Sequence, residues 1–238
     1  MKNIALIIAG GIGSRMGQDI PKQFISVYDK PVIVYTLEAF QNHHDIDGIE
    51  VVCLEGWEEV VYAYAKQFGI AKLENIVAGG ENGQESIHNG LLDIKLRHKD
   101  DDDIVLIHDA IRPMVSQQII TDNIRVCREK GNSITVVPCT AAMLKTLDSI
   151  SSKEQIARDN LKITQTPQAF YLNDIIKSHD EAMKKNITNS VASCTLYIEL
   201  GKELFMNQGS EKNIKLTTIE DIEIFKALLV AKKDSWLR

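Results

Sequence analysis

IALIIAGGIGSRM, residues 4–16, joins an apolar run to a glycine-rich turn near the beginning of the chain. The run Ile4–Ala9 contains no polar residue, as expected for a strand that is covered on both faces. Glycines directly after a strand let backbone N–H groups approach a phosphate chain, because no side chain intervenes. We therefore interpret this stretch as the first strand of an α/β sheet with a phosphate-binding turn at its carboxyl end.

Strand and helix patterns alternate from this first strand to Val137. Further strands are predicted at Ile49–Leu54, Ile76–Ala78, Ile104–His108 and Ile134–Val137. Helical patterns lie between them at Pro31–Phe40, Glu55–Phe68, Gln84–Leu96 and Gln117–Lys130. This alternation predicts an α/β fold with a mostly parallel, Rossmann-like sheet flanked by helices. Ligands of such sheets bind at the carboxyl ends of the strands.

The regular pattern is interrupted between Cys139 and Gln168, where the sequence is polar and irregular. A loop of this length inside a compact domain is usually functional or contacts a partner. Regular elements then resume at Leu172–Lys184, Leu196–Gln208 and Ile219–Ala231, the last preceded by a candidate N-cap, Thr218. We interpret residues 1–238 as a single domain with an inserted arm at about 139–168.

Composition excludes some classes of protein. The net charge of −6 does not suggest a nucleic-acid-binding surface. The four cysteines form no CxxC pair, so the sequence indicates neither a zinc site nor a disulfide framework. No run approaches the ~20 apolar residues that cross a bilayer. We expect no nucleic acid and no membrane as partners, and a cytoplasmic location.

Two basic residues follow the glycine turn. Arg15 and Lys22 would bring positive charge to a bound triphosphate. The glycines alone could form a plain turn, but Arg15 and the PKQF run (21–24) favour phosphate binding. The turn is no Walker A loop, because GxxxxGK[ST] is absent. A dinucleotide-dependent oxidoreductase is also disfavoured, because no third glycine completes the fingerprint.

AGGIGSRM (9–16) followed by PKQF resembles the cytidylyltransferases of the 2-C-methyl-D-erythritol 4-phosphate and D-ribitol-5-phosphate type. The resemblance continues in later motifs, in chain order GGENGQESI (79–87), HDAIRP (108–113), Arg158 with Leu161, QTPQ (165–168), and Gly209 with NIKLTT (213–218). It implies a nucleotidyltransferase that uses CTP and Mg²⁺ to transfer CMP to a small phosphorylated polyol and releases pyrophosphate. It also implies a homodimer whose arms exchange between subunits.

The resemblance implies roles for particular residues. The nucleotide would be bound by Ala9, Gly10, Gly11, Gly13, Gly80, Glu81 and Ser86, and the catalytic cations would be Arg15, Lys22 and Lys215. Arg158 and Thr140 would bind the acceptor. Asp109 would hold the metal, and its place after an apolar strand suits this role, because Mg²⁺ prefers one or two carboxylates plus substrate phosphates. Each of three residues also has a plainer interpretation. Asp109 could cap a helix or turn, Ser86 could be an ordinary helix residue, and Lys215 could be an exposed residue on an edge strand.

The chain departs from the family pattern at several positions. Gly83 stands where the family commonly has arginine, and Asn189 where it has an acidic residue. CTAAM (139–143) stands where the methylerythritol-phosphate type usually has an Asp-Thr pair. Gly10–Gly11 stands where the isoprenoid-pathway members more often have Ala-Gly. We therefore favour ribitol 5-phosphate or a similar alditol phosphate as acceptor. 2-C-methyl-D-erythritol 4-phosphate, of isoprenoid synthesis, is the alternative, and a non-catalytic nucleotide-binding regulator is a remote one.

Overall fold

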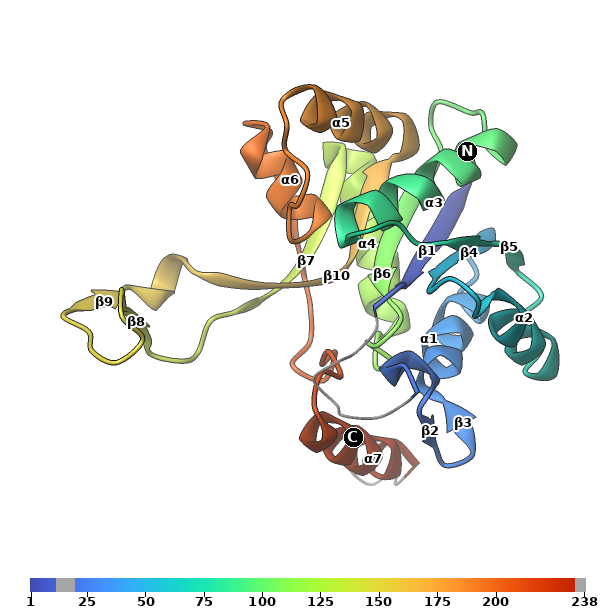
Figure 1. Ribbon diagram of the computed structural model, residues 1–238, viewed down its shortest axis with the longest axis horizontal. Helices are drawn as coiled ribbons and strands as arrows, with labels where there is room; N and C mark the ends of the chain where they lie inside the picture. Colours follow the sequence, from blue (N-terminus) through green and yellow to red (C-terminus); the bar gives the residue numbers. More distant parts are fainter. Residues whose placement is uncertain (12–19, 234–238) are drawn as a thin grey trace.

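The computed structural model describes residues 1–11 and 20–233, and its centre is a seven-stranded sheet (Figure 1). The strand order is β11-β7-β10-β6-β1-β4-β5. The strands are β1 (Asn3–Ala9), β4 (Gly48–Cys53), β5 (Leu73–Ala78), β6 (Ile104–Asp109), β7 (Asn132–Pro138), β10 (Lys162–Tyr171) and β11 (Met206–Gln208). Only β10 runs antiparallel to its neighbours in this sheet. The predicted mostly parallel sheet is confirmed.

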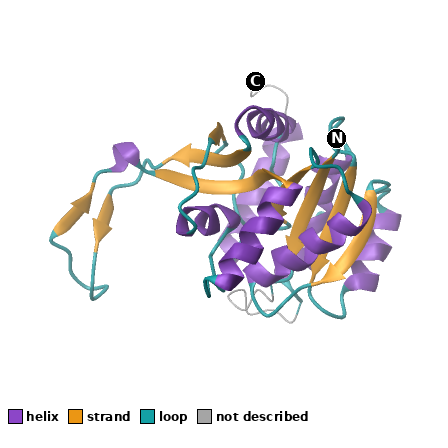
Figure 2. Ribbon diagram, turned by 90° about the horizontal axis from the view of Figure 1, so that it is seen from above, coloured by secondary structure: helices purple, strands orange, loops and turns teal. Residues whose placement is uncertain are grey.

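Helices cover both faces of the sheet (Figure 2). They are α1 (Val32–Gln41), α2 (Glu58–Gln67), α3 (Gly83–Arg97), α4 (Gln117–Lys130), α5 (Leu172–Lys184), α6 (Ser193–Glu199) and α7 (Ile219–Lys233). One core cluster joins α1, α2 and α4 to the sheet, and a second joins α3, α5 and α6. The two clusters explain the continuous apolar run of β1, because Ala5 and Ile7 enter the first and Ile4 and Leu6 the second.

Several predicted element boundaries differ from the observed ones. Pro31 precedes α1 instead of opening it, because it pairs in the small sheet of β2 (Ser26–Val27) and β3 (Lys30–Pro31). The segment Glu55–Trp57 lies before α2, where Gly56 adopts a φ of +83° that ends the preceding strand in a turn. The last helix includes Lys232 and Lys233, which were expected after its end.

The stretch 139–168 is more ordered than its sequence suggested. It contains an antiparallel pair, β8 (Met143–Lys145) and β9 (Glu154–Ile156), then a 3₁₀ turn at Arg158–Asn160 and the first part of β10. The turn between β8 and β9 is closed by Asp148, whose carboxylate accepts hydrogen bonds from the N–H groups of Ile150 and Ser151. Figures 1 and 2 show this segment projecting from the body of the molecule.

Candidate active site

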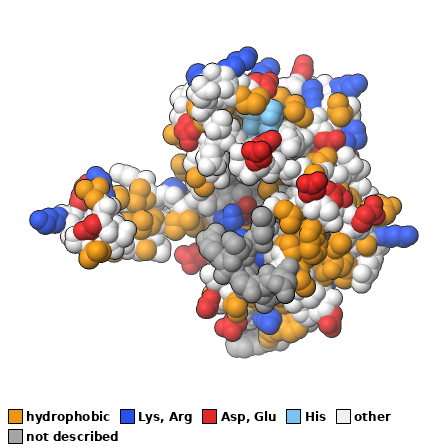
Figure 3. Space-filling model, in the orientation of Figure 1, with side chains coloured by type: hydrophobic (Ala, Val, Ile, Leu, Met, Phe, Trp, Pro, Cys, Tyr) orange, Lys and Arg blue, Asp and Glu red, His pale blue; other side chains and the backbone are white. Residues whose placement is uncertain are grey.

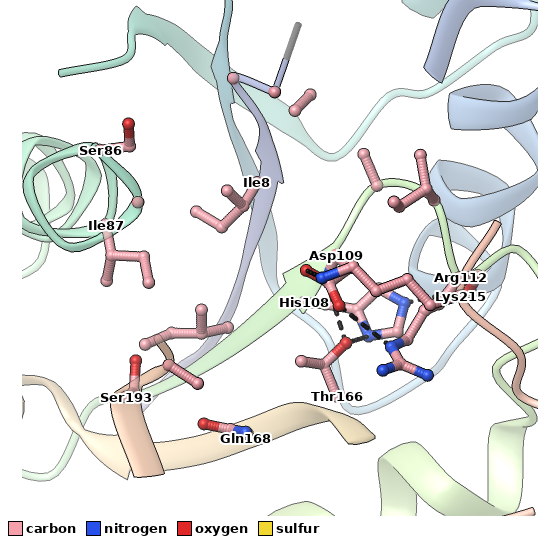
Figure 4. Close-up of a pocket in the computed structure, with 18 of the residues that line it drawn as sticks. Ile8, Ser86, Ile87, His108, Asp109, Arg112, Thr166, Gln168, Ser193 and Lys215 are labelled. Carbon is pink, nitrogen blue, oxygen red and sulfur yellow. Dashed lines mark hydrogen bonds and ion pairs between the residues drawn. The ribbon is translucent and has the colours of Figure 1, made fainter. Parts of the chain in front are cut away.

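A cavity of about 580 Å³ lies at the carboxyl ends of β1 and β6 (Figure 4). This volume is within the usual range for small-molecule sites. Its lining includes these predicted site residues: Ala9, Gly10, Gly11, Lys22, Gly80, Glu81, Ser86, Asp109 and Lys215. Gly13 and Arg15 lie outside the described residues. The structure therefore brings most of the predicted nucleotide and catalytic residues to one cavity.

Asp109 is the last residue of β6 and contacts two cationic side chains (Figure 4). Its Oδ2 accepts a hydrogen bond from Arg112 Nε at 3.0 Å, and its Oδ1 accepts one from Lys215 Nζ at 3.2 Å. Burial alone would raise the pKa of Asp109, but the charges of Lys215 and Arg112 lower it below its ordinary value. Asp109 is therefore ionised at neutral pH, and its side chain keeps 22% exposure toward the cavity.

Lys215 reaches Asp109 because the residues around it are anchored. Asn213 is fully buried and donates from Nδ2 to the backbone oxygen of Thr166 at 2.9 Å, while its own carbonyl accepts from Arg112 Nη1 at 2.8 Å. Leu216 is also buried and donates its N–H to the carbonyl of Ile111 at 2.9 Å. Lys215 belongs to no strand, so the edge-strand alternative is excluded.

His108 and Thr166 support the backbone of Asp109. Burial lowers the pKa of His108 to about 4, so the ring is neutral and has one donor and one acceptor nitrogen. Its Nε2 lies 3.2 Å from the carbonyl oxygen of Arg112, which requires Nε2 to donate. Nδ1, 3.0 Å from Thr166 Oγ1, then accepts, and Thr166 Oγ1 accepts in turn from the Asp109 N–H at 3.1 Å. Arg112, His108 and Thr166 lie inside recognised motifs but were given no role from the sequence.

The glycine turns are held by side chains from neighbouring motifs. Gln23, in the PKQF run, donates from Nε2 to the carbonyl of Ala9 at 2.6 Å. Ser86 accepts from the N–H of Gly80 at 3.0 Å and donates to the carbonyl of Asn82 at 2.8 Å. The helix predicted from Gln84 begins one residue earlier: Gly83 opens α3, and Asn82 caps it. The hydroxyl of Ser86 thus fixes the shape of a turn that lines the cavity.

Gly83 and Asn189, which depart from the family pattern, differ in their position relative to the cavity. Gly83 lines the cavity, and an added Cβ would meet no atom of the described residues within 4 Å, so packing against these residues does not require glycine there. Asn189 is exposed and does not line the cavity. Its segment is tied to α3 by Gln84, whose side chain donates to the carbonyl of Ile187 at 2.7 Å and accepts from the N–H of Ser190 at 2.9 Å.

Thr140 and Arg158 come together on the projecting arm. Arg158 Nη1 donates to the carbonyl of Thr140 at 2.6 Å, and both residues line a separate recess at the base of the arm. Neither lines the main cavity. The two residues predicted to bind the acceptor therefore lie apart from the predicted nucleotide residues of the same chain.

The cavity offers oxygen ligands to a metal ion. Asp109 and Glu81 are the acidic residues among the described ones that line it. A single ionised carboxylate beside the glycine turn fits Mg²⁺, which takes its remaining ligands from substrate and water. Within the described part of the chain, the one cluster of three possible metal ligands is His43, His44 and Asp45, elsewhere in the molecule. Both ring nitrogens of His43 are already hydrogen-bonded there.

Comparison with solved structures defines the class of protein. 2-C-methyl-D-erythritol 4-phosphate cytidylyltransferase of Francisella tularensis is 28% identical, with a TM-score of 0.80 over 94% of this chain and 98% of its own. The 4-diphosphocytidyl-2C-methyl-D-erythritol synthase of Anaerococcus prevotii, at 24% identity, shares the fold with a TM-score of 0.80 over 96% of both chains. The fold is that of a nucleotidyltransferase of the cytidylyltransferase class.

The family model of 2-C-methyl-D-erythritol 4-phosphate cytidylyltransferase (IspD) matches residues 3–231, and the chain belongs to this family. A ribitol-5-phosphate cytidylyltransferase of Lacticaseibacillus paracasei is 40% identical over 96% of this chain and 98% of its own. A second, from Vibrio parahaemolyticus, is 40% identical over 95% of both. A 2-C-methyl-D-erythritol 4-phosphate cytidylyltransferase of Clostridium botulinum is 36% identical over 96% of this chain and 97% of its own. The resemblance found in the motifs is confirmed.

None of the helices in residues 1–11 and 20–233 is both long enough and apolar enough to cross a membrane.

Proposed function

We propose that the protein transfers CMP from CTP to ribitol 5-phosphate, releasing pyrophosphate and forming CDP-ribitol. The chemistry is supported by the cluster of Asp109, Arg112 and Lys215 beside the glycine turn. The acceptor is supported by one observation: full-length relatives named for ribitol 5-phosphate reach 40% identity, and those named for methylerythritol phosphate 36%. We also expect the reaction to take place in the cytoplasm, where CTP is made.

In this reaction an oxygen of the acceptor phosphate attacks the α-phosphorus of CTP. A new oxygen–phosphorus bond forms, the bond from the α-phosphorus to the bridging oxygen breaks, and pyrophosphate leaves with that electron pair. No strong general base is needed, because the attacking phosphate is already ionised. The protein contributes positioning and neutralisation of the charge that develops in the transition state.

Lys215 and Lys22 are the described cations that we assign to this neutralisation, and Arg15 remains a predicted third. Lys215 is held at the cavity by Asp109, so its ammonium group is positioned before the substrate binds. Preorganised charge of this kind costs no reorganisation during the reaction. Arg112 keeps Asp109 ionised and oriented, so we assign it a positioning role.

Asp109 would hold Mg²⁺ against the triphosphate, and Glu81 is the other carboxylate among the described residues of the lining. A bound Mg²⁺ would neutralise triphosphate oxygens and orient the leaving group. The N–H groups of the glycine turns would contact the same phosphate chain.

We further propose that two copies form a homodimer through the arm. Leu144, Leu147 and Ile150 are 65%, 97% and 92% exposed on the arm, which is unfavourable for a segment that stays in water. Figure 3 shows hydrophobic side chains along the arm. Arg158 and Thr140, remote from the cavity of their own chain, would then complete the acceptor site of the partner subunit.

The proposal is tested by incubating the protein with CTP and Mg²⁺ and one acceptor at a time, and following pyrophosphate. Ribitol 5-phosphate should give the highest kcat/KM among alditol phosphates and methylerythritol 4-phosphate. A higher kcat/KM with methylerythritol 4-phosphate would reassign the acceptor, and no release with any acceptor would favour the regulator.

A further inference from the structure

Ser193 carries a buried hydroxyl that faces the cavity and has no assigned role. It is the first residue of α6, is 3% exposed and lines the cavity. Its Oγ has no hydrogen-bond partner among the described residues. Burying a hydroxyl without a partner is unfavourable, so such a group calls for an explanation.

The polar groups next to Ser193 are already paired with one another. Thr195 Oγ1 donates to the carbonyl of Ala192 at 2.7 Å and accepts from its N–H at 3.0 Å. Gln168 Oε1 accepts from the N–H of Cys194 at 3.0 Å, and its Nε2 donates to the carbonyl of Gln165 at 3.3 Å. Ser86, on another wall of the cavity, likewise has its hydroxyl engaged in two hydrogen bonds. Among these groups, Ser193 Oγ is the one left for a molecule that enters the cavity.

The surroundings of Ser193 indicate the chemistry of that molecule. Figure 4 shows Ser193 beside Gln168, across the pocket from the cluster of Asp109, Arg112 and Lys215. The lining contributed by residues 191–193 carries no charge and includes the apolar residues Val191 and Ala192. A neutral hydroxyl beside a neutral amide, with no charged side chain in this part of the lining, suits a hydroxylated carbon chain better than a phosphate, which would meet the cations at the other side.

We infer that Ser193 Oγ binds a hydroxyl group of the acceptor's polyol chain while the acceptor's phosphate lies toward Lys215. The inference rests on the proposed function and adds a specificity-determining residue to it. A serine hydroxyl can donate a hydrogen bond to a substrate hydroxyl or accept one from it. An acceptor that lacks this hydroxyl would leave Ser193 buried and unpaired, so the site would discriminate against it.

The Ser193→Ala variant distinguishes acceptor binding by Ser193 from a purely structural role. Because Ser193 Oγ has no partner within the described protein, its removal should leave the melting temperature unchanged or raise it. A matched control is Ser190→Ala, three residues earlier and also buried. Ser190 Oγ donates to Glu199 Oε2 at 2.9 Å and does not line the cavity. Ser190→Ala should lower the melting temperature and leave the KM values of both substrates unchanged.

The experiment measures kcat and KM for ribitol 5-phosphate and for its monodeoxy analogues at saturating CTP. Ser193→Ala should raise the KM for ribitol 5-phosphate about tenfold, the worth of one neutral hydrogen bond, with the KM for CTP within about twofold. Wild type should discriminate against one monodeoxy analogue, and Ser193→Ala should lose that discrimination.

If wild type uses ribitol 5-phosphate, two results would overturn the inference but not the proposed function. In the first, Ser193→Ala keeps the wild-type KM for the acceptor and the wild-type discrimination; in the second, Ser193→Ala changes the KM for CTP instead. If wild type transfers CMP to no polyol phosphate, the proposed function fails and the inference fails with it.

Discussion

Lys215 Nζ lies 3.2 Å from Asp109 Oδ1, although 106 positions separate the two residues in the sequence. Asp109 ends a central strand, and Lys215 lies in a loop fixed by the buried neighbours Asn213 and Leu216. The lysine side chain is still 44% exposed, so the ammonium group can contact a ligand as well as the carboxylate. The arrangement places a cation and a candidate metal ligand at the same point of the cavity.

Lys215→Ala should lower kcat by ~10²–10³, because it removes a preorganised charge that interacts with the transition state. Lys22→Ala should have an effect of the same order. Each change should lower kcat far more than it lowers the urea midpoint, which equilibrium unfolding will check. Lys212→Ala, an exposed lysine of the same loop, is the control and should keep wild-type kcat. Near-wild-type pyrophosphate release by Lys215→Ala would show that the lysine is not catalytic.

Asp109→Asn should remove most of the Mg²⁺-dependent activity. The amide keeps the size of the carboxylate but loses the charge that would bind the metal and hold Lys215. The measurement is a titration of pyrophosphate release with Mg²⁺, in which the half-saturating concentration should rise strongly. A mutant that titrates like wild type would mean that Asp109 has a structural role only.

Stability should fall on acidification through His179. Burial, together with the smaller effect of His88, whose ring stacks on it at 5.2 Å, lowers the pKa of His179 to about 4. In the unfolded chain the His179 side chain has a pKa near 6.5, so the unfolded chain binds the proton at a higher pH than the folded protein does. The contribution of His179 to the free energy of unfolding is therefore complete above pH 6.5 and is lost as the pH falls toward 4. The loss should be on the order of 3 kcal/mol of unfolding free energy.

Urea unfolding between pH 8 and pH 4 measures this effect. His179→Gln should show a shallower loss of stability over that range than wild type. His44→Gln is the control, because the His44 side chain is 82% exposed and should leave the pH profile unchanged. Equal slopes for wild type and His179→Gln would rule out His179 as the source.

Sedimentation should show that the protein is a dimer at micromolar concentration. The Arg158→Ala variant should have a higher KM for the acceptor and a nearly unchanged KM for CTP. The reason is that Arg158 lies on the arm, outside the cavity of its own chain. Mixed Arg158→Ala and Lys22→Ala chains should regain activity, because one of the two sites in a hybrid dimer would contain both intact residues. A monomer, or exchanged hybrids that remain inactive, would contradict assembly of the site in trans.

The sequence predicted best those features that depend on local signals. The helix Gln117–Lys130 was predicted with its observed bounds, because Ser116 caps its beginning and Gly131 ends it with a φ of +96°. Asp109 was predicted at a strand end because the strand predicted at Ile104–His108 directly precedes it. These signals lie within a few residues of the feature that they define.

Features that depend on distant pairing could not be predicted in this way. Nothing in the local pattern indicates that β10 inserts antiparallel between β6 and β7. The same holds for Ser193, whose burial at the cavity follows from the packing of α6, and for Thr166, which supports Asp109 across 57 positions. The family resemblance supplied motifs but not the hydrogen bonds that join them.

The most direct test of the central claim is a competition between two acceptors in one reaction. Equal concentrations of ribitol 5-phosphate and methylerythritol 4-phosphate are incubated with limiting CTP and Mg²⁺, and the products are separated by mass. The account predicts that CDP-ribitol is the dominant product and that Lys215→Ala forms neither product at an appreciable rate. Predominance of the CDP-methylerythritol product, or the absence of both products with wild type, would contradict it.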